Sequence, residues 1–221
     1  MNKQKPLIVL MGAAGSGKGT QAELLVEKLG YEHIEAGALV RAKSQENSDL
    51  GRQFKAISDS GGHAPDEMIT ALIAERFNKT TLDKPLVVDG FPRTLGQAEL
   101  FGKMLEETRR DKGPLAVVWI NVGLEEAKRR LLNRSVCTVC RTSYDNRKIS
   151  VCTKCGGKVV PRADDNPEGI AKRLGFFVHD VMSVIELYRS QGVLHEINGE
   201  QDPEHVFADL TKAVGLTGDE E

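Results

Sequence analysis

The sequence predicts an α/β fold in which a five-stranded parallel sheet is covered by helices on both faces. Two observations support this fold class. Short apolar runs rich in β-branched residues recur along the chain, and helical patterns separate them. The expected strands are Leu7–Met11, Tyr31–Glu35, Leu86–Asp89, Ala116–Val122 and Val193–Ile197. The expected helices lie near Lys18–Leu29, Pro65–Phe77, Leu95–Arg109, Leu124–Leu132, Pro167–Arg189 and Pro203–Val214.

Two stretches interrupt this alternation of strands and helices. Gly37–Ala64 is helical in pattern but comes between the second and third strands, and the polar stretch Ser135–Asp165 holds every cysteine of the chain. We therefore expect a core domain made of residues 1–36, 65–134 and 166–221, with insertions at residues 37–64 and 135–165. The polar ends, Met1–Lys5 and Thr217–Glu221, are expected to be loosely held.

Composition describes a soluble globular protein. The chain has 221 residues, of which 40% are apolar, and a formal net charge of −2, which does not favour binding to nucleic acid or to an acidic membrane. No segment approaches the ~18 apolar residues of a membrane span. The basic start and apolar stretch imitate a signal peptide, but the stretch is short and lacks a clean cleavage site. We expect a cytoplasmic monomer with reduced cysteines, unless a metal holds them.

A glycine-rich turn joins the first strand to the first helix and reads Gly12-Ala13-Ala14-Gly15-Ser16-Gly17-Lys18-Gly19-Thr20. Glycines let successive backbone N–H groups point at one anion, and the helix adds its positive N-terminal end. Lys18 supplies a charge for the outer phosphates. A flexible turn that happens to contain a lysine is the alternative, but strand, loop and helix fall in register. We expect residues Gly15, Ser16, Gly17, Lys18, Gly19 and Thr20 to bind a nucleoside triphosphate.

The four cysteines form two pairs, Cys137-x-x-Cys140 and Cys152-x-x-Cys155, separated by eleven residues. Two such pairs make a tetrahedron of thiolates suited to Zn²⁺, and Gly156 and Gly157 follow the second pair, where positive φ is needed. Redox-active pairs and disulfides are the alternatives. No histidine or carboxylate with open-site spacing accompanies the cysteines, so we expect a structural Zn²⁺ that holds a small β-rich flap.

Arginines bracket this flap: Arg130 and Arg134 precede it, and Arg162 and Arg173 follow it. A single arginine is more commonly a solvated surface charge, and a zinc ribbon alone is commonly a nucleic-acid or protein-binding module. Four arginines around one flap, on a chain with a phosphate-binding loop, instead favour phosphoryl transfer. Closure of the flap would bring fixed positive charge to the phosphate oxygens and expel water.

A second motif, Asp89-Gly90-Phe91-Pro92-Arg93-Thr94, ends the third expected strand. With the glycine-rich loop, in which Ala14 replaces a usual proline, it resembles the adenylate kinases and their nucleoside monophosphate kinase relatives over nearly the whole chain. The cysteine flap resembles the zinc-bearing lid of bacterial members, with a shorter spacer. The resemblance implies a P-loop core, an NMP-binding insertion at residues 37–64, a zinc-binding lid at residues 135–165 and Mg²⁺-dependent transfer of the ATP γ-phosphoryl group to AMP, a step of nucleotide biosynthesis.

The resemblance also implies roles for individual residues. It gives Lys18, Arg93, Arg130, Arg162 and Arg173 catalytic roles, and it adds Arg130, Arg134 and Gly199 to the ATP site. It assigns AMP binding to Ala36, Arg41, Ala64, Gly90, Arg93, Gln97, Arg162 and Arg173. Asp89 stands at the carboxyl edge of the sheet, where it can organise the water shell of Mg²⁺.

The acceptor region departs from the family pattern. Ala36 and Ala38 replace a hydroxyl and a carboxylate that adenylate kinases carry there, and alanine at position 36 also occurs in pyrimidine-accepting relatives. Gln97 nevertheless stands where adenylate kinases read the adenine edge, and an amide offers the donor and acceptor that adenine requires. We therefore expect AMP as the acceptor. A UMP/CMP-type kinase, a catalytically impaired regulatory homologue and an ATP-driven zinc-ribbon nucleic-acid binder are the alternatives.

Overall fold

A computed structural model describes residues 5–59, 64–81, 84–108, 110, 113–146, 148–162 and 164–216. It confirms the predicted fold class: a five-stranded parallel sheet has the order β2-β3-β1-β4-β8. These strands are β1 (Leu7–Met11), β2 (Glu32–Glu35), β3 (Leu86–Asp89), β4 (Leu115–Asn121) and β8 (Leu194–Asn198). The order places β1 at the centre, so the loop that follows it lies in the middle of the sheet's carboxyl edge.

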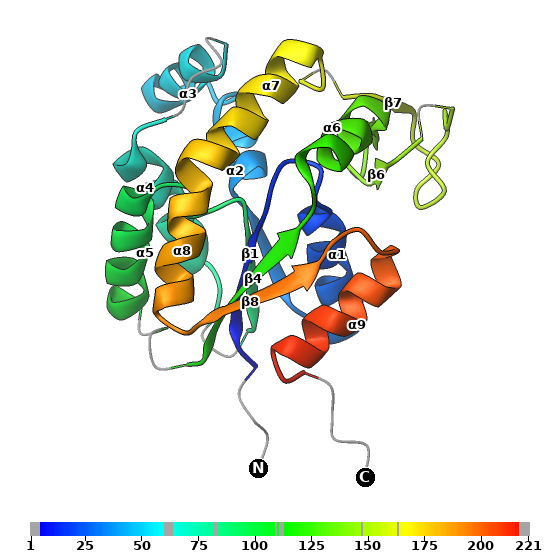
Figure 1. Cartoon of the computed structure of the whole chain (residues 1–221). Helices are drawn as coiled ribbons and strands as arrows, with labels where there is room; N and C mark the ends of the chain where they lie inside the picture. Colours follow the sequence, from blue (N-terminus) through cyan, green and yellow to red (C-terminus); the bar gives the residue numbers. More distant parts are fainter. Residues whose placement is uncertain are drawn as a thin grey trace.

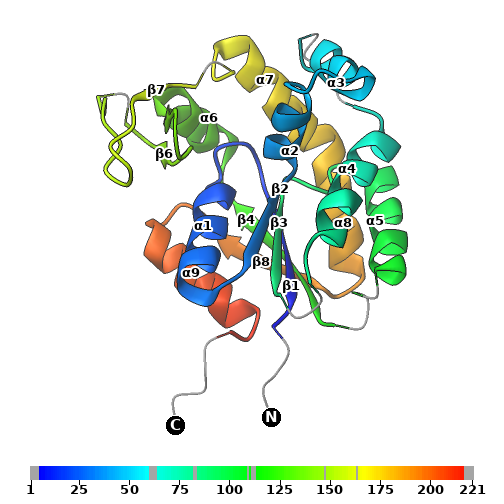
Figure 2. The same cartoon turned by 180° about the vertical axis from the view of Figure 1, so that it is seen from behind.

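Helices cover both faces of the sheet (Figures 1 and 2). They are α1 (Lys18–Leu29), α2 (Ala36–Lys43), α3 (Asp49–Asp59), α4 (Asp66–Asn78), α5 (Leu95–Glu107), α6 (Leu124–Asn133), α7 (Pro167–Phe176), α8 (Met182–Ser190) and α9 (Pro203–Ala213), with a π-helical turn η1 (Phe177–Val181) between α7 and α8.

Two apolar clusters hold the layers together, one on each face of the sheet. The α1–α9 face packs Ala22, Leu25 and Leu210 against strand residues such as Ile8. The α4, α5 and α8 face contributes the larger cluster, in which Phe101 makes edge-to-face contacts with Phe77 and Phe91. Because both of their faces are buried, the three central strands β1, β3 and β4 are apolar along most of their length, which is why their sequence signal is strong.

The two insertions project from the carboxyl edge of the sheet, at the top of Figure 1. The first carries α2 and α3. The second carries a three-stranded antiparallel sheet of β5 (Ser135–Cys137), β6 (Ser143–Tyr144) and β7 (Val159–Pro161), with β5 in the middle. In the views of Figures 1 and 2 they lie on opposite sides of the edge, so the loop after β1 lies between them.

Most expected boundaries agree with the structure to within two residues. The expected helix Pro167–Arg189 is divided by the π-helical turn, whose i→i+5 hydrogen bonds no periodicity argument foresees. Tyr31 precedes β2 because its backbone N–H donates to the Leu25 carbonyl of α1 and not to a neighbouring strand. Residues 1–4, 60–63, 109, 147, 163 and 217–221, which fall within the predicted ends, helices and insertions, lie outside the described part of the chain. Within that part, no helix combines the length and apolarity needed to cross a membrane.

Candidate active site

The glycine-rich loop, residues 12–17, curls between β1 and α1. Gly12, Gly15 and Gly17 all have positive φ, and a Cβ at Gly12 or Gly15 would lie 2.6 Å from a backbone oxygen of Ile120 or Ala127. Only glycine fits these two positions. Gly17 is also the N-cap of α1 and provides no side-chain cap, so the N–H groups of the first helical turn remain available for an anion.

Lys18 reaches back over this loop. Its Nζ donates to the carbonyl oxygens of Gly12 and Ala13 at 2.8 and 2.9 Å. Burial lowers the pKa of the lysine to about 8; the charge of Asp89 opposes this shift, and the charges of Arg93 and Arg134 add to it. The site is therefore rich in positive charge before any phosphate enters it, and an anion there would stabilise the protonated lysine.

Asp89 ends β3 beside the loop: a Cβ at Gly19 would lie 3.9 Å from Asp89 Oδ2. The side chain is largely buried, and burial raises the pKa of its carboxyl group against the opposing charges of Lys18 and His33. The Nε2 of His33 lies 4.0 Å from Asp89 Oδ2. A carboxylate at this edge, next to the glycine-rich loop, is the ligand type that Mg²⁺ and its waters prefer.

Arg93 and Gln97 are joined in one hydrogen-bond network. The Arg93 side chain donates from Nε to the Gly90 carbonyl at 2.7 Å, and its backbone N–H donates to Gln97 Oε1 at 2.8 Å. Gln97 Nε2 donates to Asp66 Oδ1 at 2.9 Å, while Thr94 donates to the other oxygen of Asp66. Gln97 is thus buried and fixed in orientation, with a second N–H and a second lone pair on its amide.

The four flap arginines are held by carboxylates. Arg130 Nε donates to Glu126 Oε1 at 2.7 Å, one helical turn earlier on α6. Arg162 makes two hydrogen bonds to Asp164, at 2.6 and 2.8 Å. Arg134 and Arg173 both donate to Asp165, whose side chain is fully buried. Each guanidinium is therefore oriented by an acid rather than left to sample solvent.

Four more residues expected to bind the acceptor, Ala36, Arg41, Ala64 and Gly90, lie on α2, just before α4 and just after β3. Arg41 on α2 donates to Glu35 at 2.7 Å. Ala36 is buried in the larger apolar cluster, Ala64 is partly buried just before α4, and Gly90 follows Asp89 with positive φ. A Cβ at Gly90 would lie 2.7 Å from the Arg93 guanidinium, so glycine gives that side chain its room.

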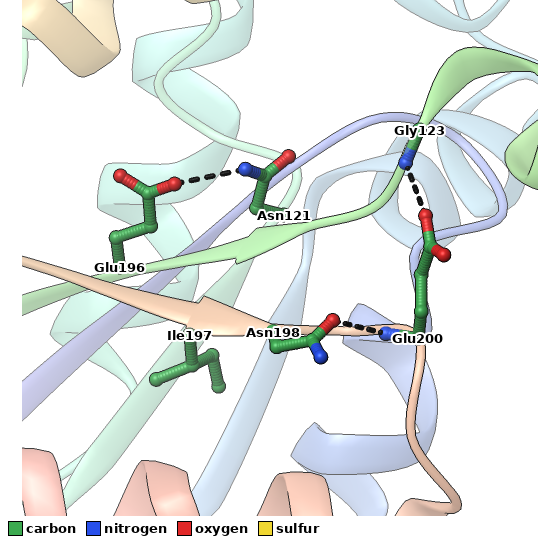
Figure 3. Close-up of a pocket in the computed structure, with 6 residues that line it drawn as sticks. All are labelled: Asn121, Gly123, Glu196, Ile197, Asn198 and Glu200. Carbon is green, nitrogen blue, oxygen red and sulfur yellow. Dashed lines mark hydrogen bonds between the residues drawn. The ribbon is translucent and has the colours of Figure 1, made fainter.

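A shallow pocket of about 390 Å³ lies where β4 and β8 end (Figure 3). The residues lining it are Asn121, Gly123, Glu196, Ile197, Asn198 and Glu200. Glu200 accepts from the Gly123 N–H at 2.8 Å, and Asn121 donates to Glu196 at 2.8 Å. Gly199 lies between two lining residues; a Cβ there would come within 2.6 Å of the Ile120 and Val122 methyl groups. Gly199 is required because the chain passes so close to β4.

The four cysteines converge in the second insertion. Their sulfur atoms all lie within 4.8 Å of one another, and none is in a disulfide. The Cys137–Cys155 and Cys140–Cys152 sulfur distances are both 3.5 Å. Thiolates at about 2.3 Å from a tetrahedral Zn²⁺ lie about 3.8 Å apart, so the cluster fits this ion.

Neighbouring groups support this cluster. Tyr144 donates its hydroxyl to Cys152 Sγ at 3.1 Å, and this bond is the largest contribution lowering the pKa of Cys152 to about 6. Gly156 has positive φ, as the knuckle pattern predicts. Gly157 matters for a different reason, because a Cβ there would lie 2.9 Å from Cys137 Sγ. Both glycines are therefore tied to the geometry of the thiolates.

The sequence analysis did not identify four residues of the site, which are one histidine and three acids: His33, Glu35, Asp66 and Glu126. It also assigned no partner to Asp165. The i,i+4 spacing of Glu126 and Arg130 was a usable signal. The contacts of Asp66 with Gln97 and of Asp165 with Arg134 each join residues 31 positions apart, so no local sequence pattern predicts them.

Comparisons with known proteins agree with this geometry. A family model described as adenylate kinase matches residues 10–193. An adenylate kinase of Geobacillus sp. (strain WCH70) is 40% identical over 213 residues, covering 94% of this chain and 98% of its own length. An adenylate kinase of Bacillus subtilis (strain 168) is 37% identical over 214 residues, covering 94% of this chain and 97% of its own length.

Proposed function

Because the chain belongs to the adenylate kinase family, we propose that it catalyses the reversible transfer of the ATP γ-phosphoryl group to AMP, giving two ADP. The observation that supports this function is the grouping of charged residues at one edge of the sheet. The glycine-rich loop with Lys18, the Asp89 carboxylate and the arginines that carboxylates hold all lie at this edge. The relatives named above favour this activity over a pyrimidine-accepting kinase.

On the donor side, the backbone of Gly15–Thr20 and the Lys18 ammonium bind the β- and γ-phosphates of ATP. Arg134 neutralises the triphosphate chain, Arg130 binds the transferred group and the nearby phosphates, and the turn at Gly199 contacts the adenine near the pocket of Figure 3. Mg²⁺ accompanies ATP, and Asp89 holds it through water. The metal supplies charge neutralisation, while the residues of the chain position the phosphates.

On the acceptor side, Arg41 and Arg93 bind the AMP phosphate, and Gln97 reads the adenine edge with its second N–H and lone pair. Ala36, Ala64 and Gly90 give the nucleotide room. Arg162 binds the transferred group and the nearby phosphates, and Arg173 bridges the two nucleotides. The acceptor phosphate oxygen attacks the γ-phosphorus in line, with no covalent enzyme intermediate, so positioning and charge stabilisation carry the rate.

Two insertions close over the substrates in this proposal. Residues 37–64 form the NMP-binding domain, residues 135–165 form a zinc-stabilised lid, and residues 1–36, 65–134 and 166–221 form the core. Closure excludes water that would otherwise accept the phosphoryl group. The enzyme acts in the cytoplasm as a monomer, with structural Zn²⁺ bound by Cys137, Cys140, Cys152 and Cys155.

The decisive experiment measures kcat/KM for AMP, CMP, UMP and GMP with Mg·ATP as donor. We expect AMP to be preferred clearly over the other three acceptors. A preference for CMP or UMP would move the protein to the pyrimidine kinases. No transfer to any acceptor, from a folded protein that binds ATP, would identify a regulatory homologue instead.

A further inference from the structure

Glu35, the last residue of β2, holds the guanidinium of Arg41 on α2. Arg41 Nη2 lies 2.7 Å from Glu35 Oε1. The Arg41 side chain is 40% exposed and that of Glu35 is 37% exposed, so a molecule arriving from solvent can reach the pair. A Cβ at Gly37 would lie 3.0 Å from Arg41 Nη1 and 3.3 Å from Glu35 Oε1. The pair therefore packs over a residue with no side chain.

More than one cation acts on the Glu35 carboxylate. Burial raises its pKa, but the hydrogen bond from Arg41 and the charges of Arg41, His33 and Arg162 outweigh burial and hold the pKa below its ordinary value. Glu35 acts in turn on Arg93: burial lowers the pKa of that guanidinium, and the charges of Asp89 and Glu35 oppose the shift. One anionic side chain thus lies within electrostatic reach of Arg41, Arg93 and Arg162.

The position of Glu35 in the sheet places it on the acceptor side of the site. Glu35 and Asp89 are register partners on the neighbouring parallel strands β2 and β3, so both stand at the carboxyl edge. Asp89 lies beside the first turn of α1, and Glu35 lies one strand further from the phosphate loop. Two of the arginines around Glu35, Arg41 and Arg93, are those to which the proposed function gives the acceptor phosphate.

We propose that Glu35 is an internal competitor for the acceptor's phosphate group and sets the affinity of the site for the nucleoside monophosphate. This inference rests on the proposed function. When the acceptor binds, its phosphate takes the Arg41 guanidinium from Glu35, and a dianion comes to lie beside a carboxylate. The lost ion pair and the like-charge repulsion both weaken binding. Neither cost applies to the donor, whose phosphates lie over the glycine loop.

The test replaces the carboxylate with a neutral amide of the same shape, Glu35→Gln. The matched control is Glu32→Gln, on the same strand and also paired with an arginine, Arg76, away from the site. Calorimetric titration with AMP should show about tenfold tighter binding to Glu35→Gln than to the unmodified protein, and no change for Glu32→Gln. The KM for AMP should fall with the dissociation constant, while the KM for ATP should not.

The shorter Glu35→Ser should also tighten AMP binding, which guards against an effect peculiar to glutamine. Unchanged or weaker AMP binding by both folded variants would overturn the inference, as would an equal tightening of adenosine, which has no phosphate to compete. Turnover of AMP by the unmodified protein distinguishes a failure of the proposed function from a failure of this inference. Its absence would count against the proposed function, whereas turnover without tightening in the variants would count against the role of Glu35 alone.

Discussion

Arg134 and Asp165 form a two-point ion pair across the base of the cysteine-bearing insertion. Nε of Arg134 lies 2.7 Å from Oδ2, and Nη2 lies 2.8 Å from Oδ1. Arg134 directly precedes β5, and Asp165 follows β7 just before α7. Arg173 of α7 donates to the same Oδ1 at 2.7 Å. One buried carboxylate therefore ties both stems of the insertion to a helix of the core.

Asp165→Asn should destabilise the fold and reduce turnover together. The change leaves two guanidinium groups sharing a neutral amide, and breaking a buried ion pair costs about 3–5 kcal/mol. Urea unfolding gives the stability change, and steady-state rates with Mg·ATP and AMP give the activity. Asp145→Asn is the matched control, since Asp145 pairs with Arg129 at an exposed position and should cost at most about 1 kcal/mol. Equal stabilities of the two variants would contradict the role of Asp165.

Arg130→Ala should lower turnover on the order of a thousandfold, because it removes charge that stabilises the transferring group. Glu126 orients this arginine through a 2.7 Å hydrogen bond, so the charge is already in place before the substrates bind. Lys103→Ala, which removes an exposed lysine paired with Glu99 on α5, should leave turnover unchanged. Near-normal rates for Arg130→Ala would show that the flap arginines are misplaced in the proposed mechanism.

Purified protein should hold about one Zn²⁺ per chain, because four thiolates at these distances make a closed tetrahedral site. Among the described residues of the insertion, the apolar cluster around the thiolates is small: Cys137, Cys152 and Val159 are buried in it, and Tyr144 and Ile149 pack against them. Metal binding therefore provides much of its folding energy. Chelation should melt the insertion at a lower temperature than the core, as followed by calorimetry. A metal-free folded protein with four freely titrating thiols would rule out this site.

ATP binding should weaken as the pH rises through about 8. In the folded protein the pKa of Lys18 is lowered to about 8 by burial, so above this pH the free protein carries a neutral amine there. The unfolded lysine stays protonated up to its ordinary pKa of 10.5, so unfolding takes up a proton between these values and this group's contribution to stability rises with pH. Binding of the triphosphate to the neutral amine must likewise take up a proton.

Calorimetry in two buffers of different ionisation enthalpy measures that proton uptake. At about pH 9 the unmodified protein should take up close to one proton on binding ATP, and Lys18→Met should take up none from this group. Uptake that persists in the variant would assign the titration to another residue of the site.

The elements predicted from sequence are those whose signals are local. The central strands β1, β3 and β4 are largely apolar, and the glycines at 12, 15 and 17 mark a backbone path with positive φ that favours glycine. The cysteine spacing likewise predicted the thiolate cluster. The acids that orient the arginines could not be predicted in the same way, because the Arg134–Asp165 pair depends on how two distant segments pack. Glu35 was also missed, since an acid at a strand end looks like an ordinary surface charge until Arg41 is seen beside it.

The last prediction concerns the orientation of Gln97. Asp66 can only accept hydrogen bonds when ionised, so it forces the amide nitrogen of Gln97 toward itself and leaves the oxygen facing the Arg93 N–H. Gly96 makes room for this arrangement, because a Cβ there would lie 2.5 Å from Asp66 Oδ2. Asp66 therefore fixes which polar edge the amide presents to the acceptor base.

Gln97→Ala should reduce the preference for AMP over CMP, UMP and GMP, because each lost hydrogen bond costs about 0.5–1.5 kcal/mol, or a few-fold to roughly tenfold in affinity. Asp66→Ala should reduce the same preference without touching the base, since it frees the Gln97 amide to rotate. Ala36→Thr, which restores a hydroxyl beside the base, should raise kcat/KM for AMP. The measurement is kcat/KM for the four monophosphates, with Thr70→Ala as the control, because Thr70 bonds the Asp66 carbonyl rather than its carboxylate. If Asp66→Ala kept the full preference for AMP while Gln97→Ala lost it, Gln97 would read the base without needing its orientation fixed by Asp66.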